Sequence, residues 1–187
     1  MTSSTGLLGG FVLAASVMLS GQTQPAPVGV QGNVTLEGTT KEVYGATNIV
    51  IVKTIDGVEH AFHYTKDLLM HGGKGSGVDA LRGLEPGSTV VVHYTTANAQ
   101  DTALEIDRVG EKGLKTTEGV VARVDRARKE ITIKYTNGKT ETLQLTDRAA
   151  AEAGTDVDAA SGGATKVVVY YSDDGGRKVA HYFKKIS

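Results

Sequence analysis

KYTNGKTETLQLTD, residues 134–147, carries an Asn-Gly pair at 137–138 that is followed by alternating polar and apolar side chains. A second segment, KTIDGVEHAFHYTK at residues 53–66, repeats this pattern after an Asp-Gly pair at 56–57. Such pairs are favoured in two-residue hairpin turns, because both central positions need positive φ. Each segment therefore predicts a β-hairpin, and the chain contains this hairpin twice.

The similarity between the two halves extends beyond the hairpins. The stretch VVVHYTTANAQDTALEI from Val90 aligns without a gap with VVVYYSDDGGRKVAHYF from Val167. Upstream, GNV at Gly32 resembles GVV at Gly119. Because the order of matching segments is the same in both halves, we expect a tandem duplication of roughly 75 residues.

Each half is expected to contain five short strands. Three come first, and they are followed by a helical or irregular connector and by two more strands. The first three are predicted at 30–36, 48–55 and 58–65 in one half, and at 116–124, 130–136 and 139–146 in the other.

The strand list predicts an all-β protein made of two tandem five-stranded barrels of the OB or SH3-like kind, with short helical connectors. Closing each sheet into a barrel removes exposed strand edges. The predicted limits are 28–112 for the first barrel and 113–187 for the second. A single sandwich of about ten strands with one core is the alternative that the same list allows.

The N-terminus predicts export. Residues 7–20, LLGGFVLAASVMLS, are apolar and uncharged, and the first basic residue is Lys41. A bilayer span needs about twenty apolar residues, so this run is typical of a signal-peptide core. We expect a signal peptide at 1–21, a linker at 22–27, a periplasmic or secreted mature chain, and no integral membrane segment in it. The alternative is a buried strand or helix of the domain itself.

The stretches GVVARVDRARKEITIKYTNGKTETLQLTD, from Gly119, and LEPGSTVVVHY, from Leu84, resemble a family of bacterial exported domains of unknown function. The resemblance covers most of the mature chain. It implies small OB-like barrels, often in tandem, and an exported location. It implies no known activity.

Composition excludes several functional classes. The chain has 187 residues, a formal net charge of −1 and no cysteine. Without a broad positive field, a nucleic-acid partner is not expected. Without cysteine, there is no disulfide, thiol nucleophile or thiolate metal site. The expected partner is a protein, an envelope polymer or a small ligand.

Charge also differs between the halves, with net −4 over residues 1–112 (7 basic, 11 acidic) and net +3 over 113–187 (13 basic, 10 acidic). Opposite charges favour docking of the two barrels, weakly and in a salt-dependent way. Random scatter of charge on solvated faces is the alternative.

Histidines are the main candidates for chemistry, because imidazole is the commonest protein metal ligand. His60 and His63 are three apart on a predicted strand, so they point to opposite faces and cannot chelate one ion. Met70, His71 and His93 form the better candidate set for copper or zinc. His181 is expected to pack on the same face as Val179 and Phe183.

No local pattern predicts catalysis. The stretch HGGKGSG, from His71, lacks the spacing of a phosphate-binding loop, and no Ser, His and Asp arrangement can be argued from the sequence. We therefore expect no enzyme activity and no cofactor. The predicted function is an exported non-catalytic binding or adaptor module of the bacterial envelope, and the alternative is a periplasmic metal-binding protein that uses Met70, His71 and His93.

Overall fold

The computed structural model describes residues 34–72, 79, 81, 83–110, 112–156 and 165–186. The predicted signal peptide at 1–21, the linker at 22–27 and the start of the first predicted strand lie outside these residues. Most of the glycine-rich loop that follows His71 also lies outside them.

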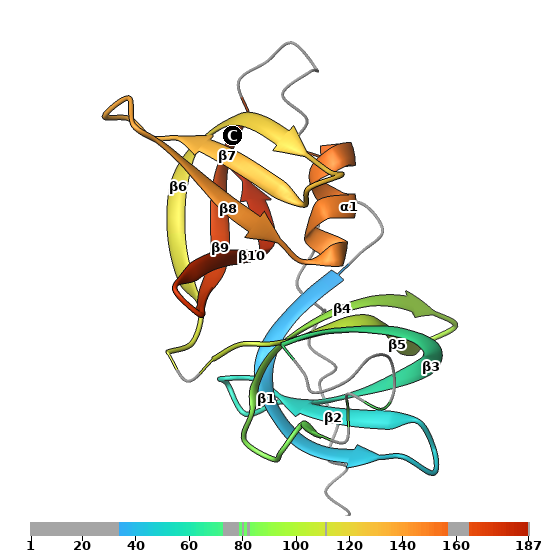
Figure 1. Cartoon of the computed structure of the whole chain (residues 1–187). Coiled ribbons are helices and arrows are strands. Elements are labelled where there is room, and N and C mark those ends of the chain that lie inside the picture. Colours follow the sequence, from blue (N-terminus) through green and yellow to red (C-terminus); the bar gives the residue numbers. More distant parts are fainter. Residues whose placement is uncertain are drawn as a thin grey trace, which may run out of the picture.

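The first half of the described chain forms a closed ring of five strands (Figure 1). Their order around the ring is β1-β2-β3-β5-β4, with β4 pairing back onto β1. All neighbours are antiparallel except β3 and β5, which are parallel. The strands are β1 (Val34–Tyr44), β2 (Ile49–Lys53), β3 (Glu59–His71), β4 (Thr89–Ala97) and β5 (Gln100–Arg108).

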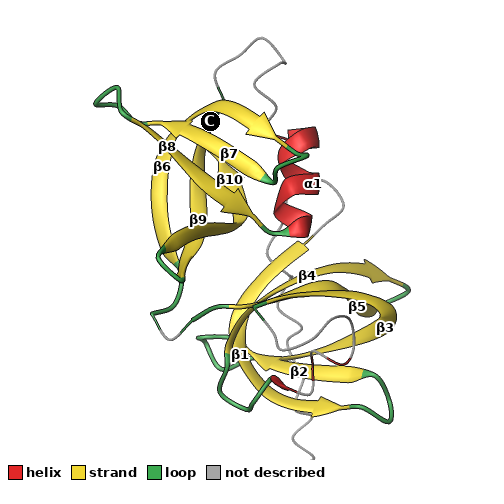
Figure 2. Cartoon of the chain, in the orientation of Figure 1, coloured by secondary structure: helices red, strands yellow, loops and turns green. Residues whose placement is uncertain are grey.

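The second half forms another closed ring with the equivalent order, β6-β7-β8-β10-β9, and again one parallel pair, β8 with β10. One α-helix, α1 (Asp147–Asp156), lies on the side of this ring that faces β4 (Figure 2). Among the described residues, no helix is long and apolar enough to cross a bilayer. The strands are β6 (Lys115–Asp125), β7 (Glu130–Lys134), β8 (Thr140–Leu145), β9 (Lys166–Asp174) and β10 (Arg177–Lys185).

Ten strands therefore divide into two rings, and a single ten-stranded sandwich does not form. Most predicted strands match an observed one, with two exceptions. The first strand was predicted at 30–36, but β1 continues to Tyr44. The second exception is β3. We predicted that it ends at residue 65, but it continues to His71 after a register shift and pairs with β5. The start of the first predicted connector is therefore strand, whereas the second connector contains α1 as expected.

The hairpin turns differ from the predicted two-residue type. Gly57 has φ of 89° and Gly138 has φ of 80°, but the residue before each glycine does not have positive φ. The amide of Gly57 donates to the carbonyl of Thr54, and that of Gly138 donates to Tyr135. This is a type I turn followed by a left-handed glycine, the common three-residue hairpin loop.

Each ring has its own core, because side chains alternate between inside and outside along a strand. In the first ring, the core includes Val50, Val52, Phe62 and Tyr94. In the second ring, the core includes Ile131, Ile133, Leu143 and Phe183, with three alanines of α1 packed against it. Two separate cores mean that any contact between the rings uses groups outside the cores, namely the outer faces of strands and of α1.

Gly38 and Gly119 occupy equivalent positions in β1 and β6, which corrects the predicted match of Gly32 with Gly119. A Cβ on Gly38 would lie 2.6 Å from the carbonyl oxygen of Lys53, and one on Gly119 would lie 2.8 Å from that of Lys134. The backbone of the neighbouring strand passes too close for any side chain at either position.

We predict that Gly38→Ala and Gly119→Ala each lower the free energy of unfolding by about 1–3 kcal/mol, the usual range for overpacking. Chemical denaturation monitored by circular dichroism would measure this. Gly45→Ala is the control, because its Cβ would meet nothing within 4 Å. Equal stability of the Gly38 and Gly45 variants would contradict the steric argument.

Candidate metal centre between the two barrels

The outer face of β4 is buried although it points away from the core of its own barrel. Val90, Val92 and Tyr94 belong to the core of the first barrel, and the intervening Val91 and His93 face outward. His93 is nevertheless 0% exposed. The second barrel therefore covers this face.

A β-bulge on the neighbouring strand adds two carboxylates to the same face. In the pairing of β4 with β5, His93 lies opposite Glu105 while Tyr94 lies opposite Ala103, so Leu104 is the extra residue. Bulges re-aim the side chains that follow them. As a result Glu105 and Asp107 point outward beside His93, and both are almost completely buried, at 1% and 0% exposure.

The second barrel supplies the opposing groups from a bulge and from a helix. His181 is the extra residue in the pairing of β10 with β9, where Ala180 lies opposite Tyr171 and Tyr182 opposite Tyr170. This bulge separates His181 from Phe183, which belongs to the barrel core, so the predicted shared face was wrong for Phe183, whereas Val179 is outside that core, as His181 is. The other groups come from α1, whose first turns run past Glu105 and His93.

Each of the three residues from the first barrel is hydrogen-bonded across the interface. His93 Nδ1 lies 3.3 Å from Glu152 Oε1. The backbone amide of Arg148 donates to Glu105 Oε2 at 3.0 Å. His181 Nδ1 donates to Asp107 Oδ2 at 2.8 Å. These three bonds hold the two barrels against each other.

The second polar atom of each residue has no hydrogen-bond partner outside the cluster. These buried atoms are His93 Nε2, Glu105 Oε1 and Asp107 Oδ1. The three residues can each offer one ligand atom within 4.8 Å of the others, and His93 Nε2 lies 3.5 Å from Asp107 Oδ2. Buried polar atoms in proteins nearly always have a partner, so three such atoms together form a candidate ligand site.

The electrostatics of the cluster are dominated by burial and by the charges that face each other. Burial, together with the charge of Asp107, raises the pKa of Glu105 to about 8. Burial disfavours charge on His93 as well, but the carboxylates of Asp107 and Glu152 outweigh it and raise the pKa of His93 to about 10. Burial also opposes ionisation of Asp107, yet His181 and His93 hold its pKa below the usual range.

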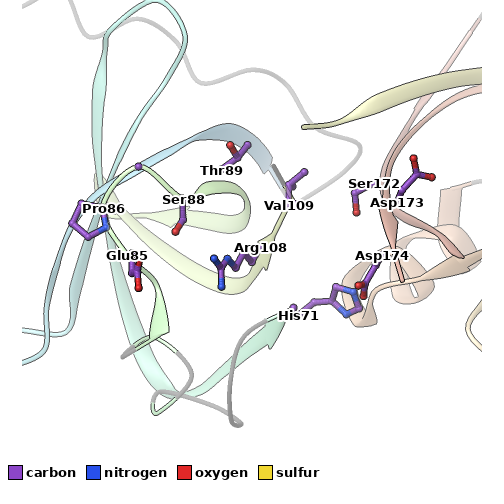
Figure 3. Close-up of a pocket in the computed structure, with 13 residues that line it drawn as sticks. His71, Glu85, Pro86, Ser88, Thr89, Arg108, Val109, Ser172, Asp173 and Asp174 are labelled. Atoms are coloured by element: carbon purple, nitrogen blue, oxygen red, sulfur yellow. The ribbon is translucent and has the colours of Figure 1, made fainter. Parts of the chain in front are cut away.

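A cavity of about 390 Å³ adjoins this cluster and is lined by both barrels (Figure 3). The first barrel contributes His71 and Arg108, and the second contributes Ser172 and Asp174. Ser172 Oγ lies 2.8 Å from His181 Nε2, so its side chain connects the cavity wall to His181 and through it to Asp107.

Ser172, His181 and Asp107 are connected in the order of a hydrolase triad, an arrangement that the sequence did not predict. Acyl transfer also needs donors placed where negative charge develops on the substrate. Asp173 and Asp174 follow Ser172 directly and line the same cavity, so they would oppose such charge.

The predicted ligand residues lie at different places. His93 is in the cluster. His71 lies at the end of β3 opposite Asp107, with its ring 6.1 Å from that of His181. Met70 packs against the core of the first barrel, and His60 stacks on Phe62 in β3, the strand that also carries His63.

Sequence reasoning missed Glu105, Asp107, Glu152 and Ser172. The alternation Glu-Ile-Asp at 105–107 is a signal for a polar outer face. Leu104, however, breaks the alternation on its N-terminal side, and the bulge becomes visible only when β5 is paired with β4.

Comparison with known proteins gives little further information. No family model matches the chain, and no curated protein matches it. Among solved structures, the chain is similar to one titled "Crystal structure of Ag(I)CusF", with a TM-score of 0.32 and 10% sequence identity. The match covers 41% of this chain and 96% of that one. A likeness at this level carries no argument about function.

We predict that His181→Ala lowers the free energy of unfolding by about 3–5 kcal/mol, because it leaves the buried Asp107 carboxylate without its closest partner. Denaturant titration in the presence of a chelator would measure the change. His63→Ala is the control, since His63 is only partly buried. If both variants were equally stable, the bond from His181 to Asp107 would not hold the interface.

Proposed function

We propose that this protein is a two-barrel metal-binding protein that holds one divalent cation at His93, Glu105 and Asp107. The observation that supports this proposal is that the two polar atoms of each side chain have different surroundings. One polar atom is oriented by the second barrel, and the other is buried and faces only the other members of the cluster. Metal-binding histidines commonly use one nitrogen for the ion and the other for a carboxylate, as His93 would with Glu152.

The donor set favours a cation of the zinc class. One imidazole and two carboxylates suit Zn²⁺ and related divalent ions, whereas soft ions such as Cu⁺ select thiolate and thioether ligands. Zinc bonds to nitrogen and oxygen are about 2.0–2.2 Å long. Ligand atoms within 4.8 Å of one another are close enough to reach one ion after small rotations. Metal binding would displace the protons that the raised pKa values of Glu105 and His93 keep there, and the two carboxylates would then match the charge of a divalent ion.

This ligand set differs from the one suggested by the sequence, with His93 as the shared member. His71 lies near the cluster at the cavity wall, and Met70 packs against the barrel core. We therefore propose Glu105 and Asp107 in place of Met70 and His71.

The finer description of the fold is also a proposal. We infer that both barrels are of the OB type and that their domains span 28–112 and 113–187. The supporting feature is the order of five strands, in which the third and fifth pair in parallel and the fourth closes the ring. A crystal structure in which β3 and β5 are unpaired would overturn this assignment.

We further propose that the mature protein is exported and acts by binding rather than by catalysis. Export is supported by the apolar run at 7–20 and by the resemblance to exported domains of unknown function. A non-catalytic function is supported by the burial of the cluster and by the two carboxylates beside Ser172.

The first prediction concerns zinc. The purified chain, freed of metal by a chelator, should bind one Zn²⁺ in isothermal titration calorimetry. Glu105→Gln and Asp107→Asn should each weaken binding by at least about 10-fold, since each removes a charged ligand. His71→Ala is the matched control, because it changes a histidine of the adjacent cavity wall.

Two outcomes would contradict this ligand set. Unchanged zinc affinity in both carboxylate variants would exclude Glu105 and Asp107. Loss of binding in His71→Ala would instead support the set of Met70, His71 and His93. Circular dichroism of each variant distinguishes loss of a ligand from loss of the fold, and the absorption of bound Co²⁺ reports the coordination directly.

The second prediction concerns export and catalysis. Protein produced with its own N-terminus and recovered from the cell envelope or medium should lack about the first 21 residues. Treatment with a fluorophosphonate should add no mass at Ser172. A full-length mass in the cytosol would refute export, and a Ser172 adduct that requires His181 would refute a purely binding function.

A further inference from the structure

The candidate ligands and the groups that orient them belong to different barrels. His93, Glu105 and Asp107 all come from β4 and β5 of the first barrel. Their orienting partners all come from the second barrel, namely Glu152 and the Arg148 amide from α1, and His181 from β10. No single barrel contains the complete arrangement.

This division makes the metal affinity depend on docking. Groups that orient metal ligands typically change metal affinity or activity by about 10–100-fold when they are removed. If the second barrel separates from the first, all three orienting groups are lost together. The three ligand residues then lie on a solvent-exposed strand surface. The ion would be bound much more tightly in the docked arrangement than in the open one.

Docking of the two barrels without a metal ion has a free-energy cost. Docking buries His93 Nε2, Glu105 Oε1 and Asp107 Oδ1 without hydrogen-bond partners. Polar atoms that lose water and gain no partner oppose burial. A bound cation would be a partner for all three atoms, so it would remove the free-energy cost of burying them at the interface.

We infer that a divalent metal ion acts as a clamp that fixes the two barrels relative to each other. The inference rests on the proposed metal site and adds what the ion does there. Coupling between two binding events is reciprocal, so docking that strengthens metal binding must itself be strengthened by the metal. The connection from β5 to β6 covers only residues 109–114, so an opened chain keeps its barrels tethered and can close again.

The absence of cysteine permits a direct test on the full chain. Ile55→Cys and Thr136→Cys place one spin label on an exposed hairpin of each barrel, and Ile55 is fully exposed. Double electron–electron resonance then measures the distance distribution between the labels. We expect one narrow distribution with saturating Zn²⁺ and a clearly broader one after chelation.

A pair of charge-neutralising variants controls this experiment. Glu152→Gln removes the carboxylate that orients His93, so it should weaken zinc binding by about 10–100-fold and broaden the distribution at zinc concentrations that saturate the unsubstituted chain. Glu118→Gln is the matched control, because Glu118 pairs with Lys166 on the exposed surface of the same barrel. Glu118→Gln should change neither the zinc affinity nor the distance distribution between the labels.

The outcomes separate the clamp from the metal site itself. If one Zn²⁺ binds through Glu105 and Asp107 but the distance distribution is equally narrow with and without it, the clamp is refuted and the metal site stands. If no Zn²⁺ binds, the metal site fails and the clamp fails with it. Metal-dependent narrowing that survives Glu152→Gln unchanged would show that the orienting groups do not provide the coupling.

Discussion

The structure depends on one buried carboxylate, that of Asp107, at the contact between the two barrels. A charge removed from water is strongly unfavourable unless other groups compensate it. Asp107 accepts a hydrogen bond from His181 of the second barrel and lies 3.5 Å from the imidazole of His93. Because the closer partner belongs to the other barrel, the compensation is complete only when the barrels are docked.

Two β-bulges make this contact possible. In a regular strand Ala103 and Glu105 would point the same way, and a carboxylate would enter the core of the first barrel. The extra residue Leu104 turns Glu105 and Asp107 outward instead. The bulge at His181 lies in β10, the strand of the second barrel that is equivalent to β5. The same local device therefore shapes both sides of the interface.

This arrangement also explains why the interface, rather than a barrel interior, carries the candidate site. Each ring encloses a compact core of aliphatic and aromatic side chains. Domains of this size bury a modest fraction of their surface and gain from any further contact. A hydrogen-bonded interface between two such barrels specifies one geometry, since its hydrogen bonds form in one arrangement only. Selective binding requires this kind of fixed geometry.

The sequence by itself determined most of the strands, the hairpin positions and the grouping of strands into two similar halves. These follow from local signals, namely period-two alternation and glycine turns, which act over a few residues. His93 was also among the predicted ligand residues. The extension of β3 to His71 and the outward turn of Glu105 were not predictable, because both depend on pairing with a distant strand. Only the tertiary structure decided that His93 meets Glu152 and that Asp107 meets His181, since these pairs are 59 and 74 positions apart in the chain and come together only when the two barrels dock.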